Sequence, residues 1–466
     1  MHKTITLLAA LGLALPVAAQ ERPGEAAFRA TYKELVETNT TQSAGSCTLA
    51  AERMAARLAA AGYPAADLHR FGVADHPKEG GLVAVLPGSD PKAKAILLLA
   101  HIDVVEARAA DWTRDPFTLI EENGVFYARG ASDDKAMAAI YVDTLIRLRA
   151  EARPRRTVKL ALTCGEETNN AFNGAEYLAS HERPLIDAAF ALNEGGGGQL
   201  GPDGKPRLLA LQVGEKTSQN YTLVVTNPGG HSSMPRPDNA INTLAAALGR
   251  VAAYAFPVRV SATTRAFWTR TAALVPPAAG AAMTTIAANA NDAAAAAALA
   301  RDPLFNSTLR TTCVTTLVDA GHAENALPQR ATANVNCRIF PGDTIEGTQA
   351  ALVAAIADPA VAVTAKPRRG PPSAPVKLDP AVVGPAEKLA AEMFPGVPVV
   401  PIMSTGATDS IFLAAAGIPS FGVPGVFHDA DGGGIHGLNE HIRVKSVLDG
   451  RDYLHRLIRI YADSRG

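Results

Sequence analysis

A short apolar run that stops at a histidine constrains this chain more than any other feature of its sequence. Residues 95–100 are uniformly apolar, which predicts a strand buried on both faces of a sheet. His101 and Asp103 follow at its carboxyl end, and side chains two residues apart on an extended chain point to the same side. Such a pair suits a metal ligand whose ring is oriented by the acid, whereas in isolation it also suits a histidine that caps a loop. The rest of the chain separates these two interpretations.

Strand-like and helical segments alternate around this run, which predicts an α/β fold with a mostly parallel sheet and helices on both faces. The pattern changes near residue 217, where longer strand-like segments and an alanine-rich helical stretch, 287–300, begin. We therefore expect a smaller α+β domain inserted over residues 217–372. The α/β domain is then divided into residues 20–216 and 373–466.

The first residues predict export. The apolar run 5–17, followed by small residues, is typical of a signal peptide over residues 1–19. No cysteine follows the expected cleavage site and no later apolar span reaches about 20 residues, so we expect a secreted protein without an anchor, in a bacterial periplasm. The net charge is −1 and no long basic block occurs, so nucleic acid is not an expected partner.

The four cysteines show no Cys-x-x-Cys spacing, so a cysteine zinc site is not expected. Cys313 and Cys337 both lie in strand-like segments of the inserted region. They either form a disulfide in an oxidising compartment or remain small buried thiols.

Histidines and acids recur where predicted strands meet their following loops. In open α/β sheets, ligands bind at the carboxyl ends of the strands. Two imidazoles and three carboxylates suit zinc but exceed what one tetrahedral ion accepts, so a shared carboxylate would serve two ions. Glu166 is then the general base for a hydroxide that bridges the metals. The five expected ligands are His101, Asp133, Glu167, Glu194 and His436.

Taken separately, these segments have plainer interpretations. A Gly-Glu-Glu sequence after a strand also fits a solvated loop, and Asp133-Asp134-Lys135 also fits the start of a helix. Their joint order along the chain favours the metal site.

Six stretches carry a resemblance to a known family: LLLAHIDVV, YARGASDDKAMAA, LTCGEETNNAFNGAEYL, ALNEGGG, NPGGHSSMP and GIHGLNEHI. They resemble the dizinc aminoacylase and carboxypeptidase family, which includes carboxypeptidase G, carboxypeptidase S, acetylornithine deacetylase and succinyl-diaminopimelate desuccinylase. The resemblance implies a zinc exopeptidase-like fold with two Zn²⁺ per subunit. It makes Asp133 the bridging ligand, Asp103 the acid that orients His101, and Glu166 the general base.

The resemblance also implies that the inserted domain, residues 217–372, is a lid or dimerisation domain, and that residues 20–216 and 373–466 form the catalytic domain. His231 matches a lid histidine that, in dimeric relatives, reaches the partner's active site and hydrogen-bonds the developing oxyanion. Arg338 matches an arginine that binds the substrate carboxylate as a planar fork. Asn325 is a further candidate lid contact, and the loop with Gly406 and Thr408 could offer backbone N–H groups to that carboxylate. The remaining histidines considered, which are expected to have no such role, are His322, His428 and His441.

We therefore expect a zinc-dependent hydrolase that cleaves the amide next to a free amino acid carboxylate. The predicted periplasmic address favours peptides, through carboxypeptidase or dipeptidase activity, and the alternative is an aminoacylase acting on N-acyl amino acids. A non-catalytic periplasmic binding protein also has two lobes, but it has no use for Glu166. The extra alanine-rich region, 272–300, places the chain nearer to the carboxypeptidase S and aminoacylase branch.

Overall fold

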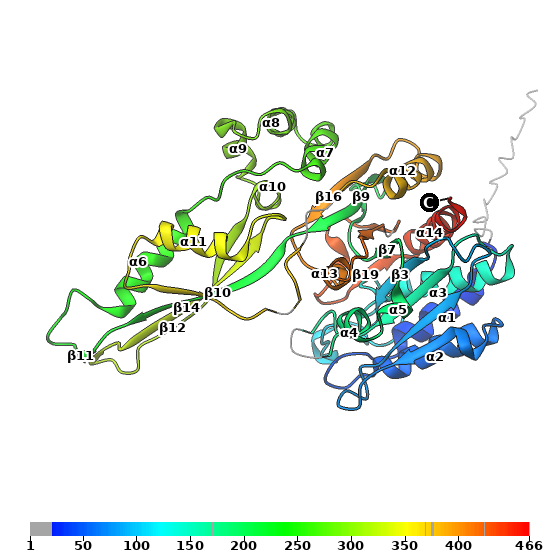
Figure 1. Cartoon of the computed structure of the whole chain (residues 1–466), viewed down its shortest axis with the longest axis horizontal. Coiled ribbons are helices and arrows are strands. Elements are labelled where there is room, and N and C mark those ends of the chain that lie inside the picture. Colours follow the sequence, from blue (N-terminus) through cyan, green and yellow to red (C-terminus); the bar gives the residue numbers. More distant parts are fainter. Residues whose placement is uncertain (1–20, 169–171, 369, 374–376, 424, 466) are drawn as a thin grey trace, which may run out of the picture.

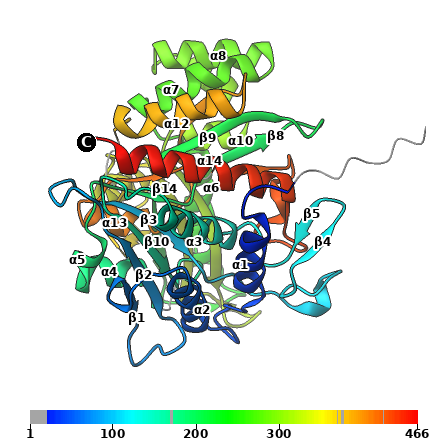
Figure 2. The same cartoon turned by 90° about the vertical axis from the view of Figure 1, so that its right-hand side faces the viewer.

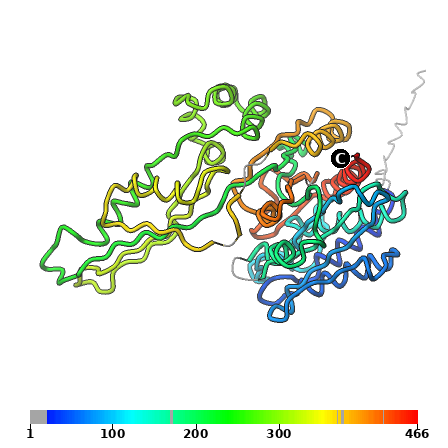
Figure 3. Tube along the Cα trace, in the orientation of Figure 1, coloured from blue at the N-terminus to red at the C-terminus, as the bar shows by residue number. Residues whose placement is uncertain are grey.

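The computed structural model describes residues 21–465 apart from 169–171, 369, 374–376 and 424, so the expected signal peptide lies outside the described residues. The chain forms a main domain and an elongated inserted part that projects from it (Figures 1 and 3). Within the described part of the chain, no helix combines the length and the apolar character needed to cross a bilayer.

A 10-stranded mixed sheet organises the main domain, in the order β1-β2-β6-β3-β7-β17-β9-β8-β18, with β16 also paired to β9. The strands from β6 to β17 are parallel, and antiparallel pairs flank them on both sides. This confirms the predicted mostly parallel centre. The strands are β1 (Leu68–Phe71), β2 (Gly81–Leu86), β3 (Ile96–His101), β6 (Val158–Thr163), β7 (Phe190–Asn193), β8 (Gly197–Leu200), β9 (Pro206–Glu215), β16 (Val399–Ser404), β17 (Ser420–Gly422) and β18 (Phe427–His428).

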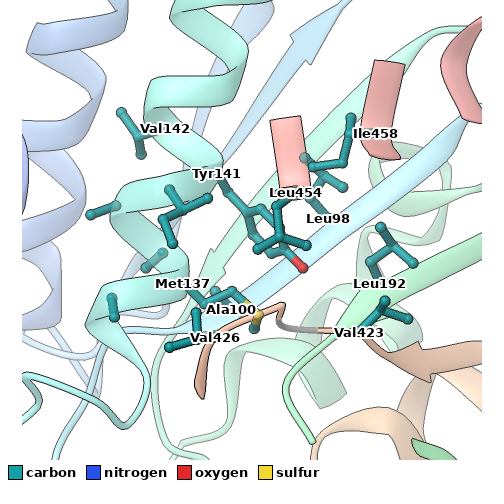
Figure 4. Packing of buried hydrophobic residues seen from close by; sticks show 14 of the residues in the cluster. Leu98, Ala100, Met137, Tyr141, Val142, Leu192, Val423, Val426, Leu454 and Ile458 are labelled. Atoms are coloured by element: carbon teal, nitrogen blue, oxygen red, sulfur yellow. The ribbon is translucent and has the colours of Figure 1, made fainter. Parts of the chain in front are cut away.

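The alternation of side chains along these strands divides the apolar residues between two cores. Leu98 and Leu192 face one core, whereas Leu97 and Leu99 face the other. Figure 4 shows Leu98 and Leu192 in the same core as Tyr141, which lies on the helix that crosses this face. Helices on both faces are thereby confirmed, and Figure 2 shows α12 beside α14. The first core involves α1 (Glu25–Glu37), α2 (Cys47–Ala60), α3 (Lys135–Ala150), α12 (Pro380–Met393) and α14 (Val444–Asp463); the second involves α4 (Gly174–His181), α5 (Arg183–Ile186) and α13 (Ser410–Ala415).

The inserted part leaves the main sheet where β9 ends and β10 begins. Its antiparallel sheet has the order β12-β14-β10-β15, and two helices cover one face. A two-stranded ribbon, β11 with β13, lies at the end farthest from the main domain (Figure 1). The elements are β10 (Thr217–Thr226), β11 (Gly230–His231), α6 (Ala240–Ala253), β12 (Thr312–Ala320), β13 (Ala326–Leu327), β14 (Arg330–Ile339), α11 (Ile345–Ile356) and β15 (Ala362–Ala365).

Residues 262–309 form a separate helical block with its own core around Trp268 and Met283. The alanine-rich stretch 287–300 contains the end of one helix and the whole of the next, which Asp292 caps by accepting a hydrogen bond from the Ala295 N–H. The block packs through its first helix on β16 of the main sheet. Its helices are α7 (Ala262–Thr271), α8 (Pro277–Ala288), α9 (Ala293–Leu299) and α10 (Pro303–Leu309).

Two disulfides join the four cysteines. Cys313 and Cys337 face each other across β12 and β14, so the disulfide alternative holds for this pair. The Cys47–Cys164 disulfide, which the sequence analysis did not predict, joins the first residue of α2 to the residue that follows β6. It therefore ties down the chain directly before Glu166.

Candidate active site

The predicted ligands gather at the carboxyl edge of the central parallel strands. His101 ends β3, Glu194 follows β7, and Glu167 lies in the loop after β6. Asp133 lies just before α3, and His436 lies in the loop before β19 (His441–Arg443). Residues from distant parts of the sequence thus meet at the edge where the strand order predicted a ligand site.

The carboxylate of Asp133 lies between the two imidazoles. Its Oδ1 is 3.1 Å from His101 Nε2, and its Oδ2 is 3.2 Å from His436 Nε2. His436 Nε2 is also 2.8 Å from Glu167 Oε1, and His101 Nε2 is 3.7 Å from Glu194 Oε2. Each histidine therefore faces the shared carboxylate and one further acid.

Asp103 holds the other side of the His101 ring. His101 Nδ1 lies 3.1 Å from the backbone oxygen of Asp103 and 3.7 Å from its Oδ1. The second carboxylate oxygen, Oδ2, accepts a hydrogen bond of 3.0 Å from the Glu167 N–H. Asp103 thus orients the ring so that Nε2 points at the cluster, and it also fixes the loop that carries Glu166 and Glu167.

The cluster combines buried acids with two histidines. Burial and the nearby Glu194 carboxylate raise the pKa of Glu166 well above its usual range, and burial raises the pKa of Glu167 to about 7. Burial opposes the charge of His101, but Glu194 and Asp133 raise its pKa well above the usual value. Hydrogen bonding to Asp133 raises the pKa of His436 to about 9. This excess of carboxylates favours bound cations.

The residues present fit divalent metal ions. Two groups share His101, namely His101 with Asp133 and Glu167, and His101 with Glu166 and Glu194, and within each group one ligand atom per residue lies within 4.8 Å of the others. Glu194 Oε1 and Asp103 Oδ1 are buried without a hydrogen-bond partner, which is costly unless another group satisfies them. Imidazole with carboxylate is a donor set that zinc accepts.

Glu440 organises the loop that carries Asp133, and the sequence analysis did not single it out. Its buried carboxylate contacts Arg129, whose guanidinium also donates to the Gly437 oxygen beside His436. Glu440 therefore connects the loops of two predicted ligands. A signal was available, because an acid four residues after His436 lies within the GIHGLNEHI stretch. The hydrogen bonds to this carboxylate, 2.8–3.0 Å long, come from the N–H groups of Gly130, Ser132 and Asp133 and from Arg129 Nη1.

The N–H groups expected to face a substrate carboxylate are already engaged inside the protein. The Thr408 N–H and hydroxyl donate to Glu215 Oε2 at 3.0 and 2.9 Å, and the Gly406 N–H donates to Ser404 Oγ. Glu215 is a second acid that the sequence analysis did not identify, and burial raises its pKa to about 8.

The inserted-domain candidates lie in two separate places. His231 and Asn325 belong to the exposed far end, where the Ser232 N–H donates to the Asn325 oxygen, and the structure does not bring them to the cluster of the same chain (Figure 1). Arg338 lies opposite Ser218, where β10 leaves the main sheet, and is half-buried. Of these three residues, Arg338 lies at the end of the inserted sheet that adjoins the main domain.

A family model identifies the class of this protein. Residues 97–460 match the model of peptidase family M20/M25/M40, and the chain belongs to this metal-dependent family. The predicted family and the predicted enzyme class, a hydrolase acting on C–N bonds, are thus confirmed.

Relatives with different named activities resemble this chain. The human N-fatty-acyl-amino acid synthase/hydrolase PM20D1 is 30% identical over 408 residues, which cover 80% of this chain and 75% of that protein. The probable carboxypeptidase S-like 2 of Dictyostelium discoideum is 27% identical over 396 residues, covering 80% of this chain and 72% of that protein. The crystal structure of the M20 metallo-carboxypeptidase Sso-CP2 from Sulfolobus solfataricus shares the fold with a TM-score of 0.67 at 18% identity, covering 93% of this chain and 99% of that chain.

Proposed function

We propose that this chain is a secreted, zinc-dependent hydrolase that cleaves the amide bond next to a free amino acid carboxylate. The observation that carries the proposal is the Asp133 carboxylate, whose two oxygens face His101 and His436 at 3.1 and 3.2 Å. Glu194 and Glu167 are then the terminal acids, one beside each histidine. The two disulfides support export, because such bonds persist in oxidising compartments.

Two zinc ions bound by these residues would polarise the scissile carbonyl and lower the pKa of a bound water. Glu166 lies within the same cluster as His101 and Glu194, so its carboxylate can accept a proton from the attacking water and return it to the leaving amine. Burial raises the pKa of Glu166, which helps it to hold that proton between the two steps. Arg338 supplies a guanidinium for the substrate carboxylate from the base of the inserted sheet.

We further propose that His231 acts on the active site of a partner subunit. It lies far from the cluster of its own chain, and β12 forms an exposed edge of the inserted sheet (Figure 1). Val314, Leu317 and Val318 on this edge are 59%, 66% and 59% exposed, which favours pairing with a second chain.

Mixing two inactive variants tests this arrangement. We expect His231→Ala to bind metal normally and to lose about 10²–10³-fold in kcat, because one oxyanion donor is removed. When His231→Ala and Glu166→Gln chains are unfolded and refolded together, about a quarter of the wild-type activity should return, because half of the dimers then contain one complete site. Each variant refolded alone is the control, and a monomer in sedimentation or a mixture that stays inactive contradicts the proposal.

Substrate class is tested with a matched panel of dipeptides and N-acyl amino acids that release the same amino acid. The predicted periplasmic location favoured peptides as substrates, whereas similarity to PM20D1 over 80% of this chain supports N-acyl amino acids. We expect kcat/KM to be at least about tenfold higher for the N-acyl amino acids, a difference of about 1.4 kcal/mol in transition-state binding. Faster cleavage of the dipeptides would instead assign carboxypeptidase or dipeptidase activity.

A further inference from the structure

A cavity of about 420 Å³ lies between the helical block and the main sheet. Phe267, Leu274 and Phe305 line it from the side of the helical block, and Val400 and Ile402 line it from β16. This volume is within the range of small-molecule sites, which are lined mostly by apolar side chains. The helical block therefore forms, together with the main sheet, a cavity large enough to bind a small molecule.

The cavity is open at its rim. Phe267, Leu274 and Phe305 are only half-buried, and Leu304 at the rim is 56% exposed. Among the described lining residues the charged one is Arg207, whose guanidinium donates to the Leu274 oxygen. Exposed apolar side chains without a free charge among them favour an uncharged, apolar occupant.

One end of the cavity lies at the carboxyl end of β16. β16 runs parallel to β9, and its last residue, Ser404, lines the cavity together with Thr405. The loop continues to Thr408, which accepts a hydrogen bond of 3.4 Å from Asn193 Nδ2, and Asn193 immediately precedes Glu194. One end of the cavity is therefore joined through a short loop to a predicted metal ligand, at the edge of the sheet where ligands bind.

We propose that this cavity binds the hydrocarbon chain of a long-chain N-acyl amino acid, while its amide bond lies at the cluster around Asp133. This inference rests on the proposed function and names the acyl side of its substrate. A hydrocarbon chain suits a cavity lined by Phe267, Leu274 and Phe305, and the loop after Ser404 connects this cavity to the residue that precedes Glu194. The helical block is thus a specificity element for the acyl group.

Chain length is the first measurement. We expect kcat/KM for a series of N-acyl amino acids, from acetyl to hexadecanoyl with one amino acid, to rise about three- to fourfold per methylene until the cavity is filled. Leu304→Asp should lower kcat/KM for the longest chains at least tenfold and leave the acetyl substrate within twofold. Ile460→Asp on α14, where the side chain is 43% exposed, is the control and should leave kcat/KM unchanged for both substrates.

Calorimetric binding of dodecanoate separates this proposal from the proposed function. Binding of dodecanoate to the wild type that weakens at least tenfold in Leu304→Asp supports the cavity proposal. If the same protein hydrolyses no amide, the proposed function is wrong and the cavity proposal still stands. Hydrolysis of acetyl substrates without chain-length dependence and without dodecanoate binding overturns the cavity proposal and leaves the hydrolase intact. A change of oligomeric state in Leu304→Asp would assign this surface to a subunit contact and would also overturn the proposal.

Discussion

The Glu166→Gln variant is expected to fold and bind metal like the wild type and to lose about 10²–10⁴-fold in kcat. The amide has nearly the same shape as the carboxylate but cannot accept the proton of the attacking water. Because Glu166 is not among the predicted ligands, the metal content should stay at two per chain. Steady-state kinetics, metal analysis and a thermal melt of the same preparation measure these three properties together.

The structure also offers a competing role for Glu166, and the same experiment distinguishes it. Glu166 lies with His101 and Glu194 in one group whose ligand atoms are within 4.8 Å of one another, so it could itself hold a metal. In that case Glu166→Gln would lose metal along with activity, as Glu167→Gln is expected to do. Glu52→Gln on the surface of α2 controls for the loss of one negative charge. Full activity of Glu166→Gln would exclude it as the general base.

Much of the site was predictable because apolar runs and chemical groups occur in a fixed order along the chain. The run that ends at His101 forms β3 with every residue buried, and Glu194 directly follows β7. Parallel strands bring such positions to one edge of a sheet, so the sequence indicated proximity without any knowledge of distances. The inserted sheet was visible for the same reason, because its strands are long and regular.

Contacts between distant loops were not predictable. The GIHGLNEHI stretch draws attention to Glu440, but only the folded chain shows its carboxylate accepting hydrogen bonds from the Asp133 loop. Cys47 and Cys164 are 117 residues apart, and nothing local indicates that they pair. Likewise, the sequence shows that Thr408 has a backbone N–H, but not that Glu215 already accepts from it.

The strands β8 and β9 and the position of the helical block were missed for a related reason. The apolar run within β9 is short, and short apolar runs fit a strand or a buried helix equally well. Which surface the alanine-rich helices cover depends on packing, because helix propensity sets their conformation but not their partner. That packing on β16 creates the cavity assigned above to the acyl chain.

Removing the metal is the second change with a large expected effect. Prolonged dialysis against a chelator should lower kcat at least about a thousandfold, because the polarised carbonyl and the lowered pKa of water both depend on the ions. Activity should return with two equivalents of zinc. The melting temperature should fall as well, since ions bound at about a thousand times their Kd stabilise a fold by about 4 kcal/mol.

Variants of the cluster test which side chains hold the ions. Because both oxygens of Asp133 face a histidine, Asp133→Ala should lose both ions, whereas Glu194→Ala and Glu167→Ala should each retain part of the metal. His441→Ala is the matched control, since this histidine lies on β19, where its Nδ1 is 3.1 Å from the Asn439 oxygen and its ring is tilted against that of Tyr127. It should keep two ions and full activity. A metal-free protein that still hydrolyses amides, or an Asp133→Ala variant that keeps both ions, would show that the shared carboxylate does not organise the reaction.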